Sequence, residues 1–135
     1  KNIPYPGMKE ALLRLRDAGK VLCVATSKPE PFARAIADRF GLAECFDFVG
    51  GASLDDTRTK KAAVIEYVLA SVGSPKPEQV LMVGDRRHDV EGAAAFGIDC
   101  VGVLYGYGSR EELTAAGACF LAEQPADIAD YVLGK

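Results

Sequence analysis

The sequence predicts an α/β fold in which helices cover both faces of a doubly wound parallel sheet. Short apolar runs without polar alternation, such as Lys20–Ala25 and Val80–Val83, are typical of strands buried on both faces. Amphipathic stretches separate these runs, which gives repeated βαβ units. The 135 residues are enough chain for one domain, so we assign a single domain to residues 1–135.

The first part of the chain predicts two helices and two strands. Apolar residues at helical spacing predict a helix over Met8–Ala18, and Gly19 is a natural stop for it. The apolar strand Lys20–Ala25 follows and leads into an amphipathic helix over Glu30–Phe40. The short run Phe46–Val49 predicts the next strand, which we expect a glycine pair to end.

The middle of the chain predicts one further helix, then a strand and its helix. A polar loop over Ala52–Thr59 precedes a helix over Lys60–Val72, which carries apolar residues at helical spacing. The proline-containing connector Ser74–Glu78 leads into the strand Val80–Val83. An alanine-rich helix over Val90–Phe96 follows this strand.

The last part repeats the alternation. Ile98–Leu104 predicts a strand, and Cys119–Ala122 predicts a short final one. Between them we expect a helix over Ser109–Ala116, whose first residue forms a capping box with Glu112. Pro125–Leu133 predicts a terminal helix with proline in its first turn. Right-handed crossovers would bring the carboxyl ends of the strands to one edge of the sheet.

Composition limits the classes of function. The net charge is −3 and no block of lysine or arginine occurs, so no nucleic-acid surface is indicated. No apolar run approaches the length of a membrane-spanning helix. The four cysteines form no CxxC pair, and with one histidine they offer no zinc set. We therefore expect a cytoplasmic protein with free thiols and neither a nucleic-acid nor a membrane partner.

Two carboxylates follow the strand Val80–Val83. Gly84 lets the chain turn at the strand's carboxyl end, where open α/β sheets place their ligands. Asp85 and Asp89 come directly after it, and two acids at such an edge suit a hard, oxygen-liganded cation such as Mg²⁺. The pattern fits equally well a turn residue, Asp85, followed by a helix N-cap, Asp89.

Polar residues also follow other predicted elements. The hydroxyl and backbone N–H groups of Thr26 and Ser27 would hold a phosphate before a helix, although either residue also fits a simple N-cap. Lys61 lies in the first turn of its helix, where the dipole disfavours a cation; it either pairs with an anion or is an ordinary surface lysine. Together, an anion clamp, a cation and metal-binding carboxylates are the parts that phosphoryl transfer needs.

These segments resemble the haloacid dehalogenase-like hydrolases, in particular their phosphoglycolate phosphatase-type branch. The resemblance extends from Tyr5 onward and is carried by PGMKEALLRLRDAGK, VATSKP, RTKKAAVIEYVL, VLMVGDRRHDVEGAAAFGI and VGVLYGYGSREEL. It implies a Rossmann-like core and a Mg²⁺-dependent phosphatase that works through an aspartyl-phosphate intermediate. A small phosphorylated metabolite would be the substrate.

The resemblance also implies a role for each candidate residue. Thr26 would bind the transferring phosphoryl group, with the Ser27 backbone beside it. Lys61 would neutralise the phosphoryl group and the nucleophile, with Lys60 as the fallback because the two lysines are adjacent. Asp85 would ligate Mg²⁺. Asp89 would ligate the ion through water or orient the surroundings of Asp85.

One part of the family pattern is missing from this sequence. The family's nucleophile is an aspartate in a DxD motif on a strand near the N-terminus, and no such motif occurs here. In the family's strand order this strand lies between Lys20–Ala25 and Val80–Val83, so its absence would leave two strands with unpaired edges. We therefore expect the chain to be the C-terminal part of a longer phosphatase, inactive alone, with a preceding segment or another chain completing the sheet.

Two alternatives remain open at this point. The chain fits a non-catalytic module that binds phosphate or a partner, or an enzyme that has lost its nucleophile. Among phosphatases the substrate is open as well, because the family's cap domain largely sets specificity and no cap is present in these residues. Phosphoglycolate, a nucleoside monophosphate, as in a 5'-nucleotidase, and pyrophosphate all remain candidates.

Overall fold

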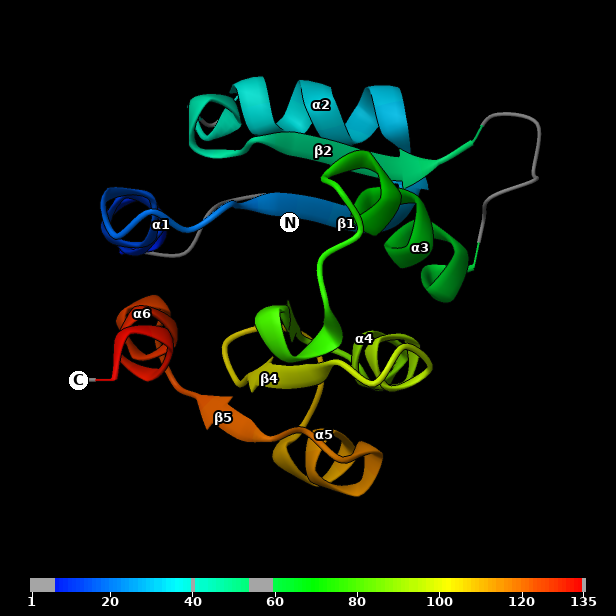
Figure 1. Ribbon diagram of the computed structural model, residues 1–135. Helices are drawn as coiled ribbons and strands as arrows, with labels where there is room; N and C mark the ends of the chain where they lie inside the picture. Colours follow the sequence, from blue (N-terminus) through cyan, green and yellow to red (C-terminus); the bar gives the residue numbers. More distant parts are fainter. Residues whose placement is uncertain (1–6, 40, 54–59, 135) are drawn as a thin grey trace.

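Two parallel sheets, rather than one, form the centre of the computed structural model (Figure 1). The structure describes residues 7–39, 41–53 and 60–134. One sheet pairs β1 (Cys23–Pro29) with β2 (Phe48–Ala52), and the other has the order β3 (Leu81–Gly84), β4 (Asp99–Val103) and β5 (Phe120–Ala122). All of these pairs are parallel. The predicted α/β class with parallel strands is thus confirmed.

Helices alternate with the strands in the predicted order. The α-helices are α1 (Met8–Asp17), α2 (Glu30–Arg39), α3 (Lys61–Ser71), α4 (Arg87–Ala94), α5 (Arg110–Ala116) and α6 (Pro125–Leu133). Two short 3-10 turns are η1 (Ala43–Cys45) and η2 (Pro77–Gln79). The predicted loop Ala52–Thr59 falls largely outside the described residues, as does Phe40. None of the described helices has the length and apolar character needed to cross a bilayer.

Two predicted strand boundaries were wrong. β1 begins at Cys23 rather than at Lys20, because Lys20 closes the end of α1 by donating its backbone N–H to Leu15. β2 runs through Gly50 and Gly51, which we expected to end it. A Cβ atom on either glycine would crowd its neighbours, so these residues let α3 and the end of β1 pack closely on the strand.

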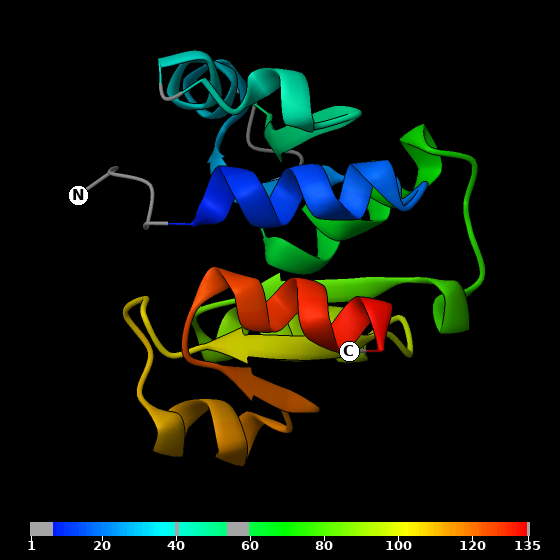
Figure 2. The ribbon, with the colours of Figure 1, turned by 90° about the vertical axis from the view of Figure 1, so that its left-hand side faces the viewer.

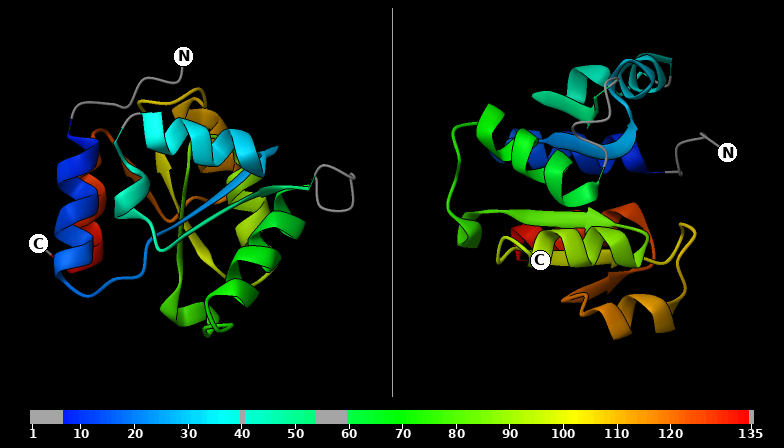
Figure 3. Two further views of the ribbon diagram at one scale, coloured as in Figure 1. Left: turned by 90° about the horizontal axis from the view of Figure 1, so that it is seen from above. Right: turned by 90° about the vertical axis from the view of Figure 1, so that its right-hand side faces the viewer.

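In the described residues, the two sheets are connected by packing between helices and not by backbone hydrogen bonds between strands. On one face α1 packs against α6 (Figure 2), and on the other α3 packs against α4 (Figure 3). β1 and β3 are the facing edges of the two sheets (Figure 3, right), and no backbone ladder connects them in the part of the chain that the structure describes. Val83 in β3 is 39% exposed and the first residues of β1 are only half-buried, although parallel strands are usually buried on both faces. The split lies between the two strands for which we expected unpaired edges from the sequence.

The cysteines are free thiols, as expected, but they differ in accessibility. Cys45 and Cys100 are 0% and 2% exposed, whereas Cys119 is exposed at the start of β5. Burial, followed by the nearby charge of Asp89, raises the pKa of Cys100 to about 12. We expect a thiol reagent at pH 8 to modify Cys119 rapidly and Cys45 and Cys100 only after denaturation. Cys119→Ser should remove the fast phase, and a fast phase that persisted would contradict this assignment.

Candidate functional site

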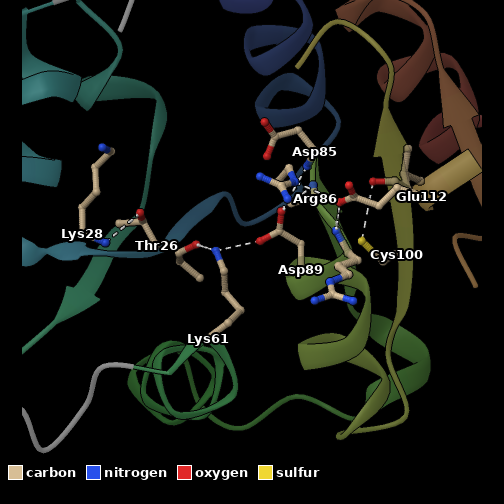
Figure 4. Close-up of polar contacts among 11 residues, drawn as sticks. Thr26, Lys28, Lys61, Asp85, Arg86, Asp89, Cys100 and Glu112 are labelled. Atoms are coloured by element: carbon tan, nitrogen blue, oxygen red, sulfur yellow. Dashed lines mark hydrogen bonds and ion pairs between the residues drawn. The ribbon is translucent and has the colours of Figure 1, made fainter. Parts of the chain in front are cut away.

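Four of the residues predicted for the site come together at the facing edges of the two sheets (Figure 4). Thr26 lies in β1, and Lys61 is the first residue of α3. Asp85 follows β3 directly, and Asp89 lies in the first turn of α4. The carboxyl ends of β1 and β3 and the N-terminal ends of α3 and α4 therefore build one polar region. This is the edge at which open α/β sheets bind their ligands.

Lys61 connects the two halves of this region. Its Nζ donates to the backbone carbonyl of Ala25 at 3.0 Å and pairs with Asp89 Oδ1 at 2.7 Å. The two charged side chains are only 16% and 9% exposed, so water screens the pair weakly. Lys60 is instead the exposed N-cap residue of α3. A Cβ on Gly92 of α4 would approach the Lys61 side chain to 3.0 Å, so the glycine lets the two helices lie close together.

Asp89 organises the turn after β3. Its Oδ2 accepts hydrogen bonds from the backbone N–H groups of Asp85 at 3.1 Å and Arg86 at 3.2 Å. Asp89 is the third residue of α4 and takes part in a capping box, in which Arg86 is the N-cap residue. The alternative assignment of the N-cap to Asp89 is therefore wrong. At 6% exposure this carboxylate needs such partners, and Lys61 with two N–H groups provides them. Gly84 is required here because a Cβ would overlap Asp89.

Asp85 is held from the other side by the loop of residues 105–108. Its Oδ2 accepts a hydrogen bond from the backbone N–H of Tyr107 at 3.0 Å. Gly106 and Gly108 lie so close that a Cβ on either would overlap Asp85. Among the described residues, no group donates to the other carboxylate oxygen of Asp85. The glycine-spaced loop thus fixes the carboxylate while leaving one oxygen for a ligand.

The predicted phosphate clamp is only partly assembled. The Oγ1 of Thr26 accepts a hydrogen bond from the backbone N–H of Lys28 at 3.2 Å, and Ser27 is exposed. β1 continues to Pro29 before α2 begins, so neither Thr26 nor Ser27 is the N-cap of that helix. The alternative assignment of an N-cap to these residues is therefore wrong. Their role in phosphate binding stays a prediction.

Glu112 is a site residue that sequence reasoning missed. Its backbone N–H donates to Ser109 Oγ at 3.0 Å, which confirms the N-cap of α5. Its carboxylate does not complete the predicted box, because Oε2 accepts instead from Arg86 Nε at 2.9 Å and from the backbone N–H of Arg87 at 2.8 Å. The bond to Arg86, and then that to Arg87, lowers the pKa of Glu112. In the sequence, the only indication of this contact is that Arg86 and Arg87 are positively charged and Glu112 is negatively charged.

The predicted Mg²⁺ site is incomplete in the described residues. They contain no group of three His, Cys, Asp or Glu side chains arranged to hold a metal ion. Asp85 offers one free oxygen, and Mg²⁺ in proteins is commonly held by one or two carboxylates together with waters and phosphate oxygens. Both carboxylate oxygens of Asp89 already have partners. This arrangement fits the second of the two roles expected for Asp89, in which it orients the surroundings of Asp85. Asp85 thus fits as one ligand of such an ion.

The close approach of the 105–108 loop gives a stability prediction. Gly106 does not have a positive φ, so alanine would test the contact with Asp85 without backbone strain. We expect Gly106→Ala to destabilise the protein by about 1–3 kcal/mol, because Asp85 or the loop must move. Tyr107→Ala, which removes an exposed side chain from the same loop, should stay within about 0.5 kcal/mol of the wild type. Urea unfolding measures both, and equal stabilities would contradict the crowding.

The chain belongs to the haloacid dehalogenase-like hydrolases, because the model of this family matches residues 1–97. Within the family its relatives place it in the phosphoglycolate phosphatase-type branch. A phosphoglycolate phosphatase of Vibrio vulnificus is 33% identical over 130 residues, which are 96% of this chain and 56% of that protein. A crystal structure of a predicted phosphatase from Clostridium acetobutylicum has a TM-score of 0.92 at 39% identity, over 97% of this chain and 60% of that one.

Two relatives with higher sequence identity than these are named for other activities. The tyrosine-protein kinase PtkA of Mycobacterium tuberculosis is 50% identical over 110 residues, which are 82% of this chain and 38% of that protein. A 5'-nucleotidase of Pseudomonas aeruginosa is 45% identical over 115 residues, or 85% of this chain and 52% of that protein. The chain therefore spans between about two fifths and somewhat over half of the length of the curated relatives it matches.

Proposed function

We propose that this chain carries the phosphoryl-binding and metal-binding half of a Mg²⁺-dependent phosphomonoester hydrolase of the phosphoglycolate phosphatase type. The observation that carries the proposal is the position of Lys61. An ammonium group has three donors, and the bonds to Ala25 and Asp89 use two of them. The remaining donor and the positive charge are available, at the carboxyl edge of the strands, to a phosphoryl oxygen.

The neighbouring groups fit the same task. Lys61 would neutralise the phosphoryl oxygens, and Asp89 would keep its ammonium charged and oriented. Thr26 would donate its O–H to a phosphoryl oxygen, since its local bond to Lys28 uses the hydroxyl oxygen only as an acceptor. Asp85 would hold Mg²⁺ with its free oxygen. When bound, the ion supplies charge stabilisation to the phosphoryl oxygens.

We further propose that the nucleophilic aspartate comes from a strand inserted between β1 and β3. This strand belongs either to a segment that precedes Lys1 or to another chain. The two facing edges, which carry no ladder to each other, and the exposure of Val83 support this proposal. A parallel strand there would join both sheets into one and bring its carboxyl end beside Lys61 and Asp85. The intermediate would then be an aspartyl phosphate.

The substrate is tested by a panel. For the protein produced with any residues that precede Lys1 in its natural chain, we expect hydrolysis of p-nitrophenyl phosphate with Mg²⁺, loss of activity on chelation with EDTA, and recovery when Mg²⁺ is added back. Comparing phosphoglycolate with nucleoside 5'-monophosphates separates the two substrate classes that the relatives' names suggest. Binding of Mg²⁺ and phosphate without turnover of any ester would favour the non-catalytic module.

Four free thiols support a cytoplasmic location.

Phosphoryl transfer to a protein tyrosine is a second candidate, favoured by the 50% identity to a protein named as a tyrosine kinase. The same cation and carboxylates would serve it, since they stabilise a phosphoryl group regardless of the acceptor. Incubation with ATP labelled in the γ-phosphate and a tyrosine-containing peptide tests it. Label in the peptide supports the kinase, whereas release of inorganic phosphate alone supports the hydrolase.

A further inference from the structure

Two carboxylates hold three consecutive backbone N–H groups at the turn after β3. Asp89 accepts from the N–H groups of Asp85 and Arg86, and Glu112 accepts from that of Arg87. Asp89 belongs to α4, which starts at this turn, but Glu112 reaches it from α5. Glu112 is therefore a tertiary clamp on the segment that carries Asp85.

Glu112 also determines where the Arg86 side chain lies. Its Oε2 binds Arg86 Nε at 2.9 Å, and this pair is partly buried. The hydrogen bond to Glu112 is the main cause of the raised pKa of Arg86, and the charges of Glu112, Asp85 and Asp89 also raise it. Figure 4 shows Arg86 among these acids. Asp85, which directly precedes Arg86 in the chain, keeps one carboxylate oxygen without a donor among the described residues, so loss of Glu112 would leave the guanidinium free to pair with that oxygen.

We propose that Glu112 is a positioning residue for Asp85: it clamps the backbone at Arg87 and binds the Arg86 guanidinium, which leaves the free Asp85 oxygen to a divalent cation. The inference rests on the proposed function, because it assigns that cation to Asp85. It differs from a capping role, since the Glu112 carboxylate accepts from Arg86 and Arg87 rather than from the backbone N–H of Ser109. A carboxylate that supports a ligand in this way typically changes metal affinity rather than the chemistry.

The test uses the protein produced with whatever residues precede Lys1 in the natural chain. Two measurements are compared: the Mg²⁺ concentration that gives half-maximal p-nitrophenyl phosphate turnover, and Mn²⁺ binding followed by electron paramagnetic resonance. Glu112→Gln should raise the Mg²⁺ requirement and the Mn²⁺ dissociation constant about 10-fold, and Glu112→Ala at least as much. Turnover at saturating Mg²⁺ should stay within about 2-fold, because the chemistry is unchanged.

Two further variants separate positioning from general structural damage. Glu111→Gln removes the same charge from the first turn of α5 and should leave the Mg²⁺ requirement unchanged. Adding Arg86→Gln to Glu112→Gln should restore part of the affinity, because the competing guanidinium is gone. Lower stability and turnover with an unchanged Mg²⁺ requirement would overturn the positioning role alone. A wild-type protein that neither binds Mn²⁺ nor depends on Mg²⁺ would overturn the proposed function, and the inference with it.

Discussion

In the protein that includes the strand carrying the nucleophile, Asp85→Asn is expected to reduce Mg²⁺-dependent hydrolysis of p-nitrophenyl phosphate on the order of 100-fold or more. Asparagine keeps an oxygen for the Tyr107 N–H and has nearly the same shape, so the loop packing should survive. What is lost is the negative charge that a hard cation requires. The free energy of unfolding without metal should therefore change by less than about 1 kcal/mol.

The matched control is Asp99→Asn. Asp99 is an exposed aspartate at the first residue of β4, so this variant removes the same charge elsewhere on the sheet. It should retain wild-type turnover and the wild-type Mg²⁺ requirement. An Asp85→Asn protein with turnover within about 3-fold of the wild type would show that Asp85 does not hold the cation.

Lys61→Met should both abolish turnover and lower the free energy of unfolding by about 3 kcal/mol. Methionine keeps much of the packing volume but leaves Asp89 as a buried carboxylate without its cation. The two remaining N–H partners of Asp89 do not carry a charge that compensates it. Urea unfolding monitored by circular dichroism measures the loss, and the slope with urea should be unchanged.

A double-mutant cycle identifies the cause of this loss. In an Asp89→Asn background the same Lys61→Met change should cost less than about 1 kcal/mol, because no buried charge is left uncompensated. Lys60→Met is the matched control, since Lys60 is exposed at the N-cap of α3. If Lys61→Met costs the same with and without the Asp89 carboxylate, the ion pair does not stabilise the junction between the two sheets.

Local sequence pattern was sufficient for the elements of this fold. Continuous apolar runs and helical periodicity predicted every described strand and α-helix in the right order, since both depend on neighbouring residues. Boundaries were less accurate where a tertiary contact overrides the pattern. α4 begins at Arg87 rather than Val90 because the Asp89 side chain caps the turn, and β2 continues through two glycines because α3 and β1 pack closely on them.

The site was predicted in its parts but not in its connections. The strand and helix ends indicated Thr26, Lys61, Asp85 and Asp89, and the last three of these are linked to one another by an ion pair and a hydrogen bond. The contact of Lys61 with Asp89 and that of Glu112 with Arg86 join residues distant in the chain. Such pairs follow from how the helices and loops pack in three dimensions, which no local pattern encodes.

The most direct test of the central claim compares two proteins in one assay. Turnover of p-nitrophenyl phosphate with Mg²⁺ is measured for the 135 residues alone and for the protein with any residues that precede Lys1 in its natural chain. We predict that the longer protein hydrolyses the ester and loses this activity with Asp85→Ala, while the 135 residues alone do not. Mg²⁺-dependent turnover by the 135 residues themselves, abolished by Asp85→Ala, would contradict the proposal that the nucleophile comes from an inserted strand.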